Sequence, residues 1–175
     1  MIAWAAIEAA LVAWVVAQTG RPAIWANQTG PQPEMPYSTL QVAGVPTIAD
    51  ELRFHPAPED ADPRDVEMEA RGEHQMTVAI NVYSRQGETF DPTKTALHLA
   101  QKVRASLGLP SVLEDLRGVG LSFIDATPIQ DLTFLQDEAF IERRQMDVRF
   151  ALASSISEIV EGIATVEVAM DEGGP

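Results

Sequence analysis

Two stretches of alternating apolar and polar residues constrain the fold of this chain most. Met76, Val78, Ile80 and Val82 alternate with Thr, Ala, Asn and Tyr. Residues 139–151 (AFIERRQMDVRFA) alternate over a longer stretch, and one of their two sides is rich in charge. A period of two predicts β-strands. We expect the first to be a central strand, and the charged side of the second predicts an exposed or interfacial sheet surface.

Helical periodicity occurs in other segments. Ile7, Leu11, Trp14 and Val15 recur every three to four residues and predict a helix over about 2–18, which Gly20 would end. A second helix is expected over 93–107, with Asp91 or Thr93 as its cap, and a third over about 110–117. The apolar stripe of the second helix comprises Ala96, Leu99, Ala100, Val103 and Leu107.

The remaining patterns predict further strands and loops. Strands are expected at 23–27, 37–45, 119–126 and 163–170, a brief extended piece at 132–135, and a short strand or edge at 50–54. Residues 28–36 are expected to be a loop, and 154–161 a turn or short helix. Because helices and strands are grouped, the sequence predicts an α+β fold, a mostly antiparallel sheet with helices packed on one face. We expect one domain over 1–170 and a disordered tail at 171–175.

The segment 50–73 is strongly acidic. It holds nine acids against three arginines, with prolines at 56, 58 and 63. Runs of charge with prolines are typical of solvated segments. We therefore expect a protruding acidic hairpin or loop here.

Charge and composition exclude several classes of function. The chain of 175 residues carries 26 acids against 12 basic residues, a net charge of -14, which opposes binding of nucleic acid phosphates. It contains no cysteine. The apolar residues 1–16 lack the basic start and cleavage site of a signal peptide and are shorter than the ~20 residues of a membrane span. We expect a helix there, and no membrane partner.

No motif for catalysis, cofactor binding or metal binding is recognisable. His55, His74 and His98 lie too far apart to converge on one helix. Ser154 and Ser155 lack the glycines of a nucleophile elbow. The acidic run at 59–62 could chelate a divalent cation, but it lacks the spacing of a calcium loop. The sequence predicts no enzyme, no cofactor and no metal site.

Two groups of charged residues are candidate contacts to subunits or partners. Arginines cluster on the predicted strand 139–151, where pairing with acids of a neighbouring strand or subunit is favoured over nucleic acid. The predicted acidic hairpin could become ordered on a neighbour. The candidate residues are Glu59, Asp60, Asp62, Arg64, Arg143, Arg144 and Arg149.

Several landmarks occur in an order that is similar to a known family. They are TG at 19–20, IWANQ at 24–28, PEMPY at 33–37, IQDLT at 129–133 and ERRQMDVRF at 142–150. Over residues 2–168 this series resembles the phage neck or tail terminator proteins, above all the neck terminators of contractile-tailed phages.

The resemblance implies a structural virion protein without catalytic residues. Such a protein would form a ring, expected to be a homohexamer, at the head-proximal end of the tail. It would terminate the tail tube and join it to a neck connector or adaptor protein, with the tail sheath as a further candidate partner. Genomic DNA would pass through the lumen without specific binding, and assembly would occur in the host cytoplasm. The alternatives are a head–tail adaptor or tail completion protein, and an unrelated small binding module.

Overall fold

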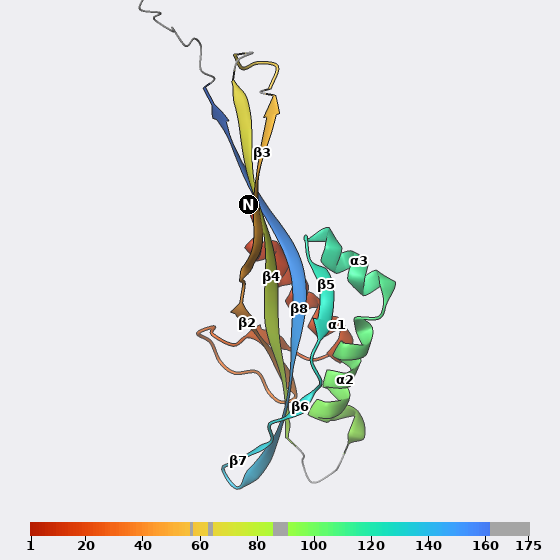
Figure 1. Ribbon diagram of the computed structural model, residues 1–175. Helices are drawn as coiled ribbons and strands as arrows, with labels where there is room; N and C mark the ends of the chain where they lie inside the picture. Colours follow the sequence, from red (N-terminus) through yellow and green to blue (C-terminus); the bar gives the residue numbers. More distant parts are fainter. Residues whose placement is uncertain (57, 63–64, 86–90, 162–175) are drawn as a thin grey trace, which may run out of the picture.

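The computed structural model describes residues 1–56, 58–62, 65–85 and 91–161 as an eight-stranded sheet with helices on one side (Figure 1). The strand order is β1-β2-β4-β8-β5, with β3 on β4 and both β6 and β7 on β8. Every pairing is antiparallel except β1 with β2. The predicted α+β fold class is confirmed. The strands are β1 (Ala23–Trp25), β2 (Tyr37–Gly44), β3 (Thr47–Pro56), β4 (Val66–Arg85), β5 (Ser122–Ala126), β6 (Gln130–Asp131), β7 (Phe134–Gln136) and β8 (Ala139–Val160).

Two long strands, β4 and β8, form the spine of the molecule. They pair without a register shift from Val66 opposite Val160 to Arg85 opposite Ile141. Because side chains alternate strictly along a strand, residues of even number stay on one face of this pair over its whole length. β2 and then β3 pair with successive parts of one edge of β4, while β5, β6 and β7 follow one another along the outer edge of β8.

Three helices cover the even-numbered face of the spine. They are α1 (Trp4–Thr19), α2 (Ala96–Ser106) and α3 (Pro110–Gly118), and a 3-10 turn, η1 (Pro92–Lys94), precedes α2. α1 ends where Gly20 adopts φ 64° and donates its N–H to Val16, a conformation that favours glycine. The Trp14 indole N–H donates to the Ser106 hydroxyl at 2.9 Å, which ties α1 to α2.

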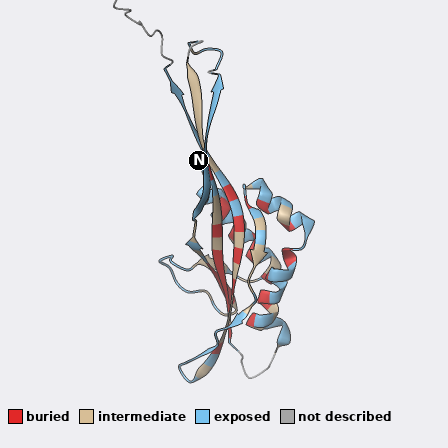
Figure 2. Ribbon diagram, viewed as in Figure 1, coloured by how far each residue is buried: buried red, intermediate tan, exposed pale blue. Residues whose placement is uncertain are grey.

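The hydrophobic core lies between these helices and the spine (Figure 2). All four apolar residues of the first alternating stretch are buried, as are the predicted inner residues of the first two helices. Phe150 on β8 is the largest fully buried side chain among the described residues. The opposite, odd-numbered face of the sheet carries no helix, and we call it the open face.

The spine extends well beyond the helices, where it forms a three-stranded blade (Figure 1). We define the blade as β3, residues 66–74 of β4 and residues 152–160 of β8, which pair with one another along their lengths. The α-amino group of Met1 donates to the Ser155 carbonyl at 2.6 Å, so the chain start lies at the base of the blade.

Three sequence expectations were wrong in detail. Residues 154–160 continue β8 instead of forming a turn or helix, because their serines pair with β4. The segment 50–73, expected as a protruding acidic hairpin or loop, lies in a hairpin, but most of it is strand in β3 and β4 and not loop. Thr95 caps α2 by accepting from the His98 N–H, whereas Asp91 caps the preceding 3-10 turn. The expected strand 163–170 and tail 171–175 lie outside the described residues.

Candidate assembly surfaces

One face of the blade is apolar and exposed. Leu52 lies opposite Ala70, which lies opposite Ile156, and Phe54 lies opposite Met68. The side chains of Leu52, Phe54 and Ile156 are 58%, 67% and 66% exposed. We call this surface the apolar blade face, and its members are Leu52, Phe54, Val66, Met68, Ala70, Ile156 and Val160. The same side also carries Asp50 near the base of the blade and Glu158 opposite Met68. It belongs to the even-numbered side of the spine, which the helices cover in the body of the molecule.

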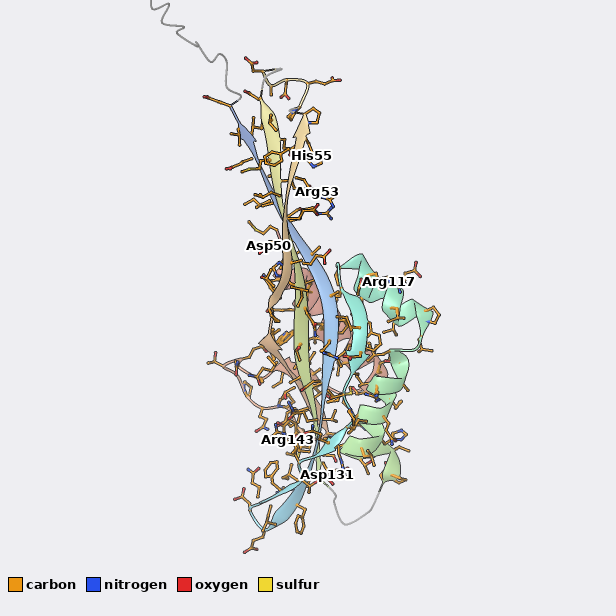
Figure 3. The ribbon with its side chains drawn as sticks, viewed as in Figure 1. Asp50, Arg53, His55, Arg117, Asp131 and Arg143 are labelled. Carbon is orange, nitrogen blue, oxygen red and sulfur yellow. The ribbon has the colours of Figure 1, made fainter. Side chains whose placement is uncertain are left out.

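The other face of the blade is charged. Arg53 pairs with Glu51 at 2.9 Å, and the Glu69 carboxylate lies 3.4 Å from His55 Nε2 and 4.0 Å from Arg71 Nε. Figure 3 shows Arg53 and His55 in this part of the blade. Half-exposed ion pairs of this kind contribute little to stability. Their charged side chains keep this side of the blade compatible with water. The blade is therefore amphipathic although it belongs to no compact core.

The candidate acids of the hairpin lie at the tip of the blade. Glu59, Asp60 and Asp62 are exposed residues of the turn between β3 and β4. The Ala61 N–H donates to the Pro58 carbonyl at 3.0 Å within that turn. Arg64 lies outside the described residues. The tip thus presents negative charge at the point farthest from the helices (Figure 1).

A polar cluster closes the core at the base of the blade. The His74 Nε2 atom lies 2.8 Å from the Ser154 Oγ atom, and its Nδ1 atom lies 3.2 Å from the Thr47 Oγ1 atom. A Cβ atom at Gly72 would lie 2.9 Å from His74 Nε2 and 3.1 Å from Asp50 Oδ1, so a side chain there would displace the members of this cluster. This cluster separates the buried core from the apolar blade face.

The contact between Ser154 and His74 resembles that between a catalytic nucleophile and its base, but the residues around it do not supply the other groups that such a pair needs. A catalytic base is oriented by a third group, and an oxyanion needs free donors nearby. Here the third group is the neutral hydroxyl of Thr47, and the surrounding residues of β4 and β8 pair in the sheet. We interpret the contact as a hydrogen bond that holds β3, β4 and β8 together.

The open face holds Arg143 flat against the sheet. Its Nε donates to Asn81 Oδ1 at 3.0 Å, and its guanidinium lies 5.7 Å from the centre of the Tyr83 ring. Tyr83 in turn stacks on Tyr37 with ring centroids 5.0 Å apart. These contacts give Arg143 a fixed orientation on a face that carries no helix.

The other two candidate arginines have acidic partners within the chain. Arg144 pairs with Asp131 of β6 at 2.8 Å and with Glu142 at 3.2 Å. Arg149 forms a bidentate contact with Asp125 of β5. From the sequence we expected these arginines to pair with acids of a neighbouring strand or of a neighbouring subunit. The contacts within the chain correspond to the first of these alternatives.

Glu142 joins β8, β4 and α2 in one network that the sequence did not reveal. Its carboxylate accepts from the Ser84 hydroxyl at 2.9 Å, from the Ala96 N–H at 2.9 Å and from the Leu97 N–H at 3.2 Å. Carboxylates at a helix N-terminus satisfy free N–H groups and oppose the helix dipole. Burial, the largest single influence, raises the pKa of Glu142, but donors from Ser84, Ala96, Arg144 and Leu97 together outweigh it and lower that pKa.

The structure distributes the predicted residues over distant places. The tip acids lie at the end of the blade, while Arg143 and Asp131, the partner of Arg144, lie near the opposite end of the spine (Figure 3). Beyond Arg143, the paired strands β7 and β8 expose Leu135 and Phe140. Within the described ranges, no group of His, Asp and Glu could hold a metal ion. No helix in that part of the chain is long and apolar enough to cross a membrane.

Comparison with known proteins gives one clear result. The family model described as "Phage neck terminator protein" matches residues 5–174, nearly the whole chain. A search of curated proteins found no match. The matched range includes the spine, the helices and the blade.

Proposed function

We propose that this chain, which belongs to the phage neck terminator protein family and is a structural protein of the phage neck or tail, forms a closed ring. The ring would lie on the last ring of the tail tube. In this position it stops tube growth and offers a surface to the neck connector or adaptor. We propose a homohexamer in a contractile-tailed phage, assembled in the host cytoplasm, with the sheath as a further partner. The family match leaves the unrelated binding module without support.

The observation that carries the ring proposal is the exposed apolar blade face. Exposed apolar patches on soluble proteins often mark interaction sites, and Leu52, Phe54 and Ile156 are each more than half exposed. A repeated contact between unlike surfaces of identical subunits closes into a ring when the rotation allows it. The net charge of -14 fits a ring whose lumen lets DNA pass without holding it.

Negative-stain images of the purified chain mixed with tail tubes test this proposal. We expect rings that cap one end of each tube and tubes that no longer lengthen. Binding to the portal-side connector without capping would indicate the head–tail adaptor instead. Uncapped tubes together with an unbound connector would contradict both functions.

We propose that the acids at the tip of the blade contact an adjacent subunit or the neighbouring ring. Deleting residues 59–64 is expected to weaken ring or tail assembly and to leave the monomer folded, because the tip lies outside the core. Sedimentation velocity and circular dichroism measure the two effects. A matched control replaces the same residues with an uncharged linker of equal length. Normal assembly of both variants would contradict a role of the tip.

We further propose that the arginines of β8 reach acids across a subunit contact, and Arg149 allows the cleanest test. Exchanging the pair, with Arg149→Asp and Asp125→Arg, keeps an ion pair within the chain but reverses its polarity. We expect a folded monomer, because an exposed ion pair adds little to stability. We also expect a loss of assembly at a concentration where the wild type assembles. The same exchange at Asp91 and Lys94, paired at 2.9 Å, is the control. Assembly of the Arg149 variant at wild-type concentration would overturn the contact.

A further inference from the structure

The apolar blade face continues the surface that the helices cover in the body. β4 and β8 keep one register throughout, so the row that begins at Met76 and Val78 in the core continues through Ala70 and Met68 into the blade. In the body, α1 and α2 lie on this row and bury it. In the blade Ala70 and Met68 are half-buried and their neighbours on β3 and β8, such as Leu52 and Ile156, are exposed, because no helix of the chain covers this part of the row.

The chain contains a largely apolar helix, α1, and one side of it is exposed to solvent. α1 has 16 residues, of which Glu8 is the charged one. Its inner side holds Ile7, Leu11, Trp14 and Val15, all buried. Its outer side is exposed and consists mostly of small apolar residues, Ala5, Ala6, Ala9, Ala13, Val16 and Ala17, with the exposed Glu8 at its margin. A helix that is apolar all round is normally buried on all sides.

From these two surfaces we infer that the apolar blade face of one subunit packs on the outer side of α1 of the next copy. This inference rests on the proposed ring and names its subunit contact. α1 then lies between its own sheet and the blade of its neighbour, which reproduces on its second side the helix-on-sheet packing of the body. The two surfaces differ, so the contact is head-to-tail, as a closed ring requires.

The dimensions of the two surfaces agree. A helix of 16 residues is roughly 24 Å long. The blade is roughly 30 Å long and, with three strands, roughly 14 Å wide, which accommodates one helix lengthwise. Its footprint of roughly 400 Å² is half of the ~800 Å² that each partner gives to a standard interface. One such contact is weak alone, and ring closure gives every subunit two of them.

Cross-linking tests the contact directly, because the chain contains no cysteine. Two single variants are prepared, Ala9→Cys on the outer side of α1 and Ile156→Cys on the apolar blade face. They are mixed and treated with a short bismaleimide. We expect covalent dimers in the mixture and little product from either variant alone. The double variant should give a ladder that ends at the ring size.

The matched control places the second cysteine on the charged side of the same strand, as Ser157→Cys. Proximity in the assembled ring should give on the order of tenfold more dimer for Ile156→Cys than for Ser157→Cys. Equal yields from both would overturn the inference.

The remaining outcomes separate this inference from the proposed function. Cross-links of Ile156→Cys to itself, or to tail tube protein after mixing, would overturn the contact with α1 and leave the ring standing. Rings in negative stain without any of these cross-links would also overturn the contact with α1 but not the ring. Absence of both rings and cross-links would overturn the inference and the ring proposal together.

Discussion

Replacing Leu52 and Ile156 with aspartate is expected to abolish assembly and leave the monomer folded. In the assembly each change buries an unpaired carboxylate in an apolar contact, which costs several kcal/mol per charge. In the monomer both side chains are more than half exposed, and substitutions at such surfaces change stability by about 0.5 kcal/mol or less. Sedimentation velocity should show a monomer at concentrations where the wild type is assembled, with an unchanged circular dichroism spectrum.

A control with the same added charge distinguishes burial from repulsion. Ser155→Asp and Ser157→Asp place two carboxylates on the charged side of the same blade. This variant should assemble like the wild type, because neither residue faces the proposed contact. If both double variants fail to assemble, added negative charge alone explains the loss. If both assemble, the apolar blade face is not the contact.

Replacing Glu142 with alanine is expected to lower the free energy of unfolding by about 2–4 kcal/mol, because hydrogen bonds to a charged group are strong and the partly buried donors left behind cost desolvation energy. The Ser84 hydroxyl and the N–H groups of Ala96 and Leu97 all donate to this carboxylate. Urea unfolding measures the change. Glu138→Ala, in the exposed β7–β8 turn, is the control and should change stability little. A loss as small as that of the control would contradict the role of Glu142 in anchoring α2.

The same carboxylate makes stability depend on pH. Its pKa is lower in the folded chain than its ordinary value of 4.5. A group with a lowered folded pKa stabilises fully above its unfolded pKa, and this contribution is lost as the pH falls through the folded pKa. Glu142→Gln should therefore be less stable than the wild type at pH 7, and the difference should shrink below pH 4.5. A constant difference over that range would contradict the lowered pKa.

The sequence predicted the core correctly, since periodicity reports local geometry. The alternation at Met76, Val78, Ile80 and Val82 identified the central strand, and the spacing in the first two helices identified their buried sides. These signals are strong because one face of each element is uniformly apolar. The resemblance to neck terminators, read from short motifs in order, is confirmed by the family match.

The length of the strands in the blade was underestimated because charge content obscured their alternation. Residues 66–73 (VEMEARGE) alternate apolar and charged residues as strictly as the core strand does. Their acids led us to expect a protruding acidic hairpin or loop. In a strand whose charged side faces water, acids on every second residue are compatible with pairing. A test for period two would have found the blade and its apolar face.

The Glu142 network could not be predicted from local patterns. Its partners, Ser84 and the start of α2, lie 58 and 46 residues away along the chain. The expected caps, Asp91 and Thr93, are the residues that propensity favours near a helix start. In the folded chain, Glu142 of β8 accepts from the first N–H groups of α2, which neither Asp91 nor Thr93 contacts. The His74–Ser154 contact was invisible for the same reason, with 80 residues between its members.

The state of association of the purified chain tests the central claim most directly. Sedimentation velocity over a series of concentrations, with the mass of the largest species confirmed by native mass spectrometry, distinguishes a closed ring from other assemblies. The account predicts a monomer that converts to one closed multimer of fixed size as concentration rises, without larger species. A chain that stays monomeric at every concentration, alone and with tail tubes, would contradict it.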